Sequence, residues 1–142
     1  MKQTAAGIII FKYLDNNPLF LGLIALKKFQ EKSKGIYDVT KGRIDPGETA
    51  YEAAKRECYE EARLIPNKII EGPFISGALT LWLAYCDKDP VILENPEVGH
   101  VEHLGYEWVN PDVMLDNCLD YLRPAIKWAK DIIYNQKHYL LK

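Results

Sequence analysis

The chain has 142 residues, of which 48% are apolar and 27% are charged, and its formal net charge is −2. This balance is ordinary for a globular protein, and the length suits a single domain spanning residues 1–142. A slightly negative charge argues against a broad surface for duplex nucleic acid, so we expect no stable nucleic-acid complex. No apolar stretch has the length of a membrane span or the pattern of a signal peptide. The three scattered cysteines lack C-x-x-C spacing, which predicts reduced thiols in a cytoplasmic protein.

The first quarter of the chain predicts a β-hairpin. Residues 5–13 and 19–26 are rich in β-branched and large apolar side chains, and residues 15–18 between them have the composition of a turn. A polar, lysine-rich loop is expected over 29–35. A short strand over 36–39 should then lead into a loop that contains glycine and proline.

The next expected element is a helix over 49–62. Thr49 is a suitable N-cap, and Glu52 three residues later completes a capping box. Small side chains recur on one face and would let the helix pack closely on a sheet. These side chains are Ala50, Ala53, Ala54 and Cys58. Pro66 marks the exit from the helix.

The second half of the chain predicts further strands followed by helices. The expected elements are strands over 69–75 and 78–86, a loop over 87–101, a strand over 105–109, and helices over 112–117 and 120–136. Pro124 fits the last helix only if it lies in the first turn. This order of elements predicts an α+β fold.

Three glutamates near the end of the 49–62 helix form the most informative pattern. In a helix, Glu57, Glu60 and Glu61 stand at i, i+3 and i+4, so their carboxylates project from one side. Like charges ~4 Å apart repel by about 1 kcal/mol in water, and the helix dipole disfavours anions near the C-terminus. A divalent cation such as Mg²⁺ prefers oxygen ligands and would turn this repulsion into a binding site. The alternative is a solvated helix face.

The stretch from Gly42 to Leu64 resembles the Nudix box, G-x5-E-x7-R-E-U-x-E-E-x-G-U, in which U is a bulky apolar residue. The matching positions are Gly42, Glu48, Arg56, Glu57, Glu60, Glu61 and Leu64, with Cys58 at the first U. Arg63 replaces the last glycine of the pattern. The resemblance implies a Nudix-type α/β/α sandwich with a mixed β-sheet. It also implies a hydrolase of nucleoside diphosphates that are linked to another group.

The same resemblance implies a role for each residue of the box. Glu57 and Glu61 would be the main ligands of Mg²⁺ (or Mn²⁺), with Glu60 as a third ligand and the Gly42 carbonyl as a fourth. Arg56 would orient these carboxylates by pairing with them, with support from Glu48. Arg63 would sit where glycine often adopts a left-handed conformation, at a cost of roughly 1 kcal/mol. We therefore expect intact catalysis and a slightly altered turn.

A second segment, residues 101–108, resembles the His-Glu-His…Tyr-x-Trp segment of the asymmetrical diadenosine tetraphosphate hydrolases, a Nudix branch. There the glutamate binds metal and is a candidate general base, a role that falls on Glu102, with Glu94 and Glu97 as weaker candidates. His103 would contact a phosphate or cap the following strand, and Tyr106 is a further candidate substrate contact. A zinc site using the histidines at 100 and 103 is an alternative, although it lacks a third clear ligand.

Three residues before and within the box are further candidates for substrate binding. Lys41 matches a lysine that usually precedes the box and would contact a phosphate oxygen, with a plain surface lysine as the alternative. Arg43 belongs to a basic group of residues that either meets substrate phosphates or lines a solvated loop. Tyr37 occupies a place where the branch often has tryptophan, and it would either stack on adenine or belong to the core.

These resemblances predict a small-molecule nucleotide substrate. The leading hypothesis is hydrolysis of diadenosine tetraphosphate to ATP and AMP in the cytoplasm. Alternative substrates are 5′-triphosphorylated RNA ends, diphosphoinositol phosphates and ADP-ribose. A non-catalytic nucleotide-binding sensor is the alternative of another class, although it would not need the full set of glutamates.

Overall fold

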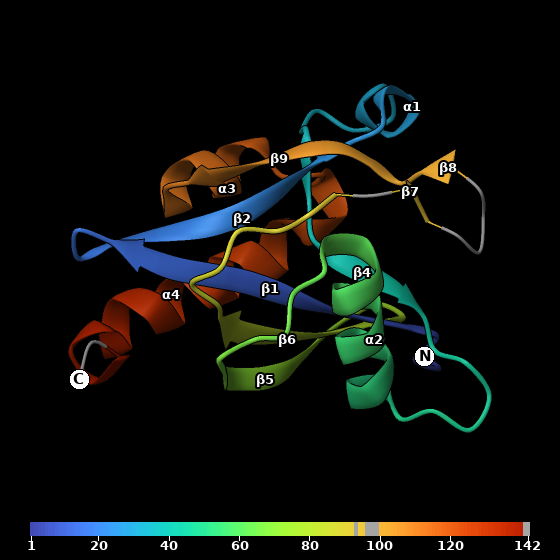
Figure 1. The fold of residues 1–142 in the computed structure, drawn as a ribbon, viewed down its shortest axis with the longest axis horizontal. Helices are drawn as coiled ribbons and strands as arrows, with labels where there is room; N and C mark the ends of the chain where they lie inside the picture. The colour runs from blue at the N-terminus through green and yellow to red at the C-terminus, as the bar shows by residue number, and fades with distance from the viewer. Residues whose placement is uncertain (93, 96–99, 141–142) are drawn as a thin grey trace.

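The computed structural model describes residues 1–92, 94–95 and 100–140, and its centre is a mixed β-sheet (Figure 1). The strands are β1 (Ala5–Leu14), β2 (Asn17–Ala25), β3 (Tyr37–Asp38), β4 (Thr40–Arg43), β5 (Lys68–Ser76), β6 (Leu79–Tyr85), β7 (Glu94–Asn95), β8 (His100–Val101) and β9 (His103–Val109). The helices are α1 (Lys27–Gln30), α2 (Ala50–Ala62), α3 (Pro111–Asn117), the 3-10 turn η1 (Asp120–Leu122) and α4 (Arg123–Leu140).

Strand β1 organises the sheet because it pairs with three other strands. It runs antiparallel to β2 and β4 and parallel to β6, so the sheet is mixed, as predicted. The main path of the sheet is β3-β2-β1-β6-β5, with β4 paired to β1 and β9 paired to β2. The short strands β7 and β8 pair only with each other among the described residues.

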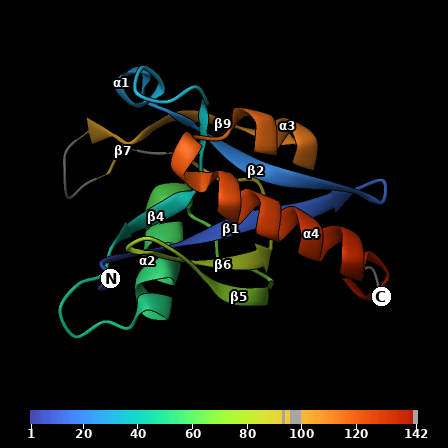
Figure 2. The ribbon, with the colours of Figure 1, turned by 180° about the vertical axis from the view of Figure 1, so that it is seen from behind.

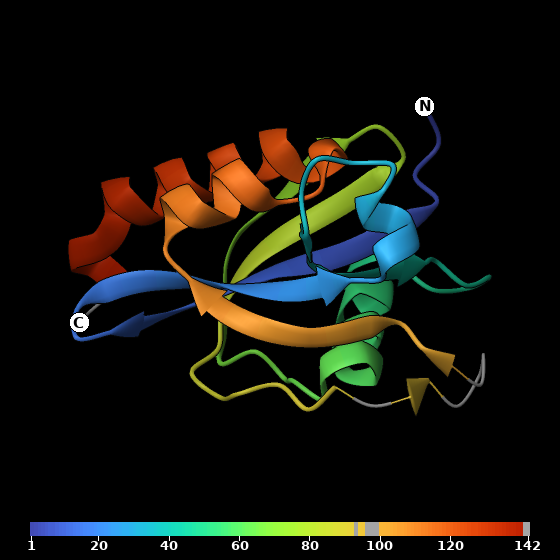
Figure 3. The same ribbon diagram turned by 90° about the horizontal axis from the view of Figure 1, so that it is seen from above.

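Alternate side chains of β1 face opposite layers of the fold. Ile8 and Ile10 belong to the core cluster beneath α2, whereas Ile9 and Phe11 belong to the cluster beneath α3 and α4. Figure 3 shows α3 and α4 on one side of the sheet and α2 on the other, and Figure 2 shows α4 lying across its face. The predicted sandwich of helices around a sheet is therefore confirmed.

Several elements match the sequence prediction closely. Asp15 and Asn16 form a two-residue hairpin turn, since both have positive φ (51° and 67°) and the strand pair closes at Leu14 and Asn17. The capping box at the start of α2 is present. Pro124 is the second residue of α4 and so lies in its first turn, as required.

Other elements differ from the prediction because their conformation is determined by contacts that the local sequence pattern does not show. The expected loop over 29–35 begins as the helical turn α1, in which the amide of Glu31 donates to the carbonyl of Lys27 (3.0 Å). Thr40–Arg43, expected as loop, forms β4 because it pairs with the distant residues 5–8. The expected loop over 87–101 contains β7 and β8, and residues 120–122 form a 3-10 turn before α4 begins.

Arg63 ends α2 in the left-handed conformation, with φ 56° and ψ 31°. Its amide donates to the Tyr59 carbonyl (2.8 Å), and its guanidinium lies 5.2 Å from the centre of the Tyr59 ring. The arginine thus adopts the backbone conformation that glycine favours at a helix end. None of the described helices is both long and apolar enough to span a membrane.

Candidate active site

The capping box and the small-residue face of α2 set the position of the acidic residues. The Thr49 hydroxyl accepts from the amide of Glu52 (3.1 Å), and the Glu52 carboxylate accepts from the amide of Thr49 (2.9 Å). Ala53, Ala54 and Cys58 are fully buried against the sheet. With the helix start and one face fixed, the residues near its end are held beside β4.

Arg56 connects the acidic residues of α2 with the loop before it. Its Nε donates to Glu48 Oε2 (2.7 Å) and its Nη2 to Glu48 Oε1 (3.0 Å), a bidentate pair. Its Nη1 donates to Glu57 Oε1 (2.9 Å) and Glu60 Oε2 (3.2 Å). The hydrogen bonds to Glu48, followed by those to Glu57, raise the pKa of Arg56 above its ordinary value. This geometry suits the orienting role that the sequence suggests for Arg56.

Gly42 lies directly against the carboxylate of Glu57. A Cβ built on Gly42 would overlap the carboxylate carbon and both oxygens of Glu57. The glycine therefore permits a close approach between β4 and α2, and any larger residue would displace Glu57. This contact gives a physical reason for the first glycine of the motif.

Glu61 is the most enclosed of the glutamates, with its residue only 5% exposed. Its Oε2 accepts from the amide of Lys41 at 3.3 Å. Burial raises its pKa well above the usual range, and a hydrogen bond with the Glu57 carboxylate and the charge of that group add to this effect. The negative charge of Glu102 raises the pKa further, and the charge of Lys41 opposes this rise. Glu57, Glu61 and Glu102 therefore bring negative charge to one place.

This donor set fits a divalent cation of the Mg²⁺ or Mn²⁺ kind. Carboxylate and carbonyl oxygens are the ligands that such hard cations prefer, and a cation would offset the repulsion between Glu57 and Glu61. As the side chains stand, no three His, Cys, Asp or Glu residues among those described already form a metal-ligating group. Arg56 holds Glu57 and Glu60 by hydrogen bonds in this arrangement.

Sequence reasoning missed Asp38, a buried carboxylate beside the site. Its Oδ1 accepts from the Tyr121 hydroxyl (2.7 Å) and the Val39 amide (2.9 Å). Its Oδ2 lies 3.1 Å from Lys41 Nζ and 3.3 Å from His103 Nε2. Burial by itself would raise the pKa of Asp38, but the hydrogen bond with His103, the charge of Lys41 and the Tyr121 hydroxyl lower it to about 2. The one feature of the sequence that could have revealed this site is an aspartate within a short apolar strand. The sequence around Tyr121 has no feature that predicts its contact with Asp38.

Two of the candidate substrate contacts, Tyr37 and His103, are buried. Tyr37 is only 5% exposed, belongs to the core cluster, and donates its hydroxyl to Glu107 Oε2 (2.7 Å). Its ring is covered and has no open face for adenine, so the stacking role is corrected in favour of the core alternative. His103 is also buried, between Asp38 and Glu61, with its Nδ1 3.9 Å from Glu61 Oε1. It therefore faces carboxylates and also lines a cavity of about 190 Å³, so the suggested phosphate contact stays a prediction.

The remaining candidates lie around the same region. Lys41 and Arg43 lie on β4 and line a cavity of about 870 Å³. Lys41 and Glu102 also line a smaller cavity of about 190 Å³. Tyr106, on β9, is half-buried and packs against the core cluster beneath α2.

Some alternatives fall on residues that the structure does not place. Glu97 lies outside the described residues, and so do the side chains of Glu94 and His100. The zinc alternative and the two weaker metal ligands therefore stay predictions.

Comparison with known proteins gives one family match and several similar structures. The family model described as NUDIX domain matches residues 1–129. The comparison with curated proteins gives no match. A binary complex of an Ap4A hydrolase from C. elegans is 21% identical, with a TM-score of 0.70 over 92% of this chain and 97% of that one.

Two further solved structures show the same fold. A NUDIX hydrolase from Listeria monocytogenes is 15% identical, with a TM-score of 0.71 over 96% of this chain and 97% of that one. The NUDIX domain of Shewanella oneidensis NrtR, complexed with ADP ribose, is 14% identical, with a TM-score of 0.60 over 94% of this chain and 89% of that one. At these identities the likeness concerns the fold.

Proposed function

Because the chain belongs to the NUDIX domain family, we propose that it is a divalent-metal-dependent hydrolase that cleaves diadenosine tetraphosphate into ATP and AMP. The family predicted from the Gly42–Leu64 motif is the family found. Membership supports a pyrophosphohydrolase that acts on nucleoside diphosphates linked to another group. The choice of diadenosine tetraphosphate as the substrate is part of this proposal. It depends on the resemblance of residues 101–108 to the asymmetrical diadenosine tetraphosphate hydrolases.

One observation carries the proposal: Glu61 is buried beside Glu57 with too few positive partners. A buried carboxylate that shares its site with another carboxylate is destabilising unless a cation or proton joins it. A protein that only bound nucleotide would have no use for such a site. The arrangement therefore favours catalysis over a sensor function.

In this proposal the residues act as follows. The cation ligands are Glu57, Glu60, Glu61, Glu102 and the carbonyl of Gly42. When bound, Mg²⁺ or Mn²⁺ neutralises phosphate charge and lowers the pKa of bound water. Arg56 keeps the carboxylates oriented through its hydrogen bonds to Glu48, Glu57 and Glu60. Lys41, at the edge of the site, contacts a phosphate oxygen.

The reaction itself is a displacement at phosphorus. A water oxygen attacks one phosphorus atom, a new P–O bond forms, and the bridging P–O bond of the anhydride breaks. Glu102 takes the proton of the water, and the leaving phosphate departs with the bonding electron pair. Among the chain's own groups, Lys41 and Arg43 supply positive charge close to β4 to balance these phosphates.

The proposal also covers the cellular compartment, the domain organisation and the alternative substrates. We place the enzyme in the cytoplasm, since its three cysteines are free and buried, and we treat residues 1–142 as one domain. ADP-ribose is the second candidate substrate, because a structural neighbour is a complex with ADP ribose. RNA 5′ ends and diphosphoinositol phosphates remain further alternatives.

The test is chromatographic identification of products from purified protein with Mg²⁺. We expect ATP and AMP from diadenosine tetraphosphate and slower turnover of ADP-ribose. Two molecules of ADP as products would contradict the proposed bond cleavage. Tight nucleotide binding without turnover of any substrate in the panel would favour the sensor.

A further inference from the structure

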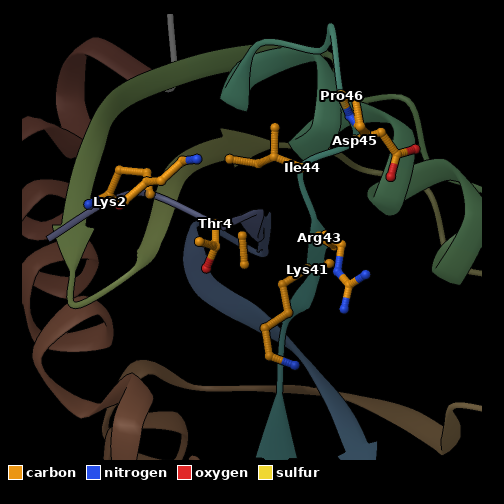
Figure 4. A pocket seen from close by; sticks show the side chains of 10 residues that line it. Lys2, Thr4, Lys41, Arg43, Ile44, Asp45 and Pro46 are labelled. Atoms are coloured by element: carbon orange, nitrogen blue, oxygen red, sulfur yellow. The ribbon is translucent and has the colours of Figure 1, made fainter.

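A cavity near the site lies between the N-terminal segment and β4. It has a volume of about 870 Å³, which is within the range of small-molecule sites. Figure 4 shows Lys2 and Thr4 on one side of it and Arg43 and Ile44 on the other. None of the residues proposed above as carboxylate ligands lines this cavity.

The charges around the cavity are predominantly positive. Lys2, Lys41 and Arg43 line it, and Asp45 is its one acidic lining residue among those described. Asp45 lies 3.4 Å from the Arg56 guanidinium, which it shares with three glutamates, so its charge is partly balanced. Within the described part of the chain, Lys2 and Arg43 have no carboxylate within ion-pair distance. An anion in the cavity would therefore meet two cations that are not already engaged in ion pairs there.

The wall that carries Lys2 is fixed to the sheet. The amide of Thr4 donates to the Ala78 carbonyl (2.9 Å), and the amide of Ile44 donates to the Thr4 carbonyl (3.0 Å). The Gln3 side chain donates to the Gly77 carbonyl (3.1 Å). Because residues on both sides of the cavity are tied together, its shape exists before any ligand binds.

The cavity adjoins the acidic site at β4. Gly42 lines the cavity, and the same residue lies against the Glu57 carboxylate. Lys41 also belongs to both places, because its amide donates to Glu61 and the residue lines the cavity. The glutamates and the cavity thus share one strand, and Gly42 lies at both.

We propose that this cavity binds the part of the substrate beyond the cleaved bond, a nucleoside polyphosphate. The inference rests on the proposed function. Lys2 and Arg43 contact the phosphates, with the guanidinium of Arg43 suited to bidentate contact. Ile44 and Pro46 supply apolar surface for the nucleoside. Such a subsite favours substrates with a long polyphosphate chain over those with two phosphates.

A pair of charge-reversal variants tests the proposal. Lys2→Glu places a negative charge at the cavity. Lys68→Glu makes the same change in net charge on an exposed residue at the far end of the β5–β6 hairpin. The seven residues from Leu79 to Tyr85 separate the two ends by six strand steps, about 20 Å.

We expect Lys2→Glu to raise the KM for diadenosine tetraphosphate about tenfold, with a much smaller rise for ADP-ribose. Lys68→Glu should change either KM by less than about twofold, because salt screens charges at that distance. Equal KM values for the two variants would overturn the proposal. Lys2 is exposed, so loss of folding is not expected, and matching far-UV circular dichroism spectra verify this.

Direct binding separates this inference from the proposed function. Calorimetry with inorganic tripolyphosphate, without Mg²⁺, should show binding to the unsubstituted protein and to Lys68→Glu, and binding at least about fivefold weaker to Lys2→Glu. If no nucleotide is hydrolysed but this dependence on Lys2 holds, the proposed function fails and the anion site stands. If tripolyphosphate binds all three proteins equally, the cavity assignment is wrong whatever the turnover.

Discussion

Asp38 and Glu61 are equally buried carboxylates, each 5% exposed, but their pKa values are shifted in opposite directions. Asp38 accepts hydrogen bonds from Tyr121 and Val39 and lies beside Lys41 and His103. Glu61 has the Lys41 amide and a second carboxylate, that of Glu57. Burial by itself raises the pKa of both groups, so the difference comes from their partners.

This comparison separates two uses of a buried charge. The donors around Asp38 satisfy its charge within the protein, so it joins β3, β4, β9 and η1 into one unit. Glu61 accepts from the Lys41 amide and lies near His103, but its neighbour Glu57 is a second carboxylate, and folding alone gives no reason to place the two together. Carboxylates held with unbalanced charge in a cleft are frequent at functional sites. We therefore expect Asp38 to serve the stability of the fold and Glu61 to serve the proposed chemistry.

The largest effect expected is on activity, from Glu61→Gln. The amide keeps the size of the side chain but removes the charge that a cation needs. We expect kcat with Mg²⁺ to fall at least about a hundredfold, which corresponds to about 2.7 kcal/mol. The thermal midpoint of the metal-free protein should stay the same or rise, because the repulsion with Glu57 is gone. Glu71→Gln, on an exposed position of β5, is the control. A Glu61→Gln enzyme with near-normal kcat would remove Glu61 from the metal site.

The second effect is on stability, from Asp38→Asn. The pKa of Asp38 is lowered from 3.8 to about 2, so its ionised form stabilises the folded state by about 2 kcal/mol at neutral pH. Urea unfolding should show a loss of this size. Asp112→Asn is the matched control, because Asp112 also pairs with a lysine (2.6 Å to Lys130) but its side chain is 72% exposed. That exposed pair should contribute less than about 1 kcal/mol. Equal losses would show that burial does not matter here.

The same pair of proteins predicts a pH dependence. Asp38 has a lowered folded pKa, so its contribution is fully present above pH 3.8 and disappears as the pH falls towards about 2. The difference in unfolding free energy between the unsubstituted protein and Asp38→Asn should therefore shrink between about pH 4 and pH 2. A difference that stays constant over this range would mean that a lost packing contact, and not the charge, explains the variant.

Local patterns predicted the parts of the site that depend on nearby residues. The capping box at Thr49 and Glu52 and the i, i+3, i+4 spacing of the glutamates are encoded within one helix, so the register of α2 followed from the sequence. Asp38 could not be found this way. Its partners His103 and Tyr121 are 65 and 83 residues away, and only the folded sheet brings them together.

The same limit explains the corrections at Tyr37 and β4. A tyrosine in a short strand can face either layer, and its ring packs here over Gly22, where any Cβ would overlap it. Neither Gly22 nor the pairing of β2 with β3 is visible from the residues around Tyr37. Thr40–Arg43 lacks the apolar alternation of a strand, and its pairing with β1 decides its conformation.

The smallest effect concerns the end of the helix that positions Glu61. Arg63 has a φ of 56°, a conformation that disfavours any Cβ, and its guanidinium lies over the Tyr59 ring. In Arg63→Gly the loss of strain of about 1 kcal/mol is offset by the lost ring contact and by the added freedom of the unfolded chain, each about 0.5 kcal/mol. We expect a net change of less than about 0.5 kcal/mol. Arg63→Ala keeps the strain and loses the ring contact, so it should be less stable than the unsubstituted protein. If thermal unfolding instead ranks alanine above glycine, the ring contact and chain entropy, not backbone strain, govern this helix end.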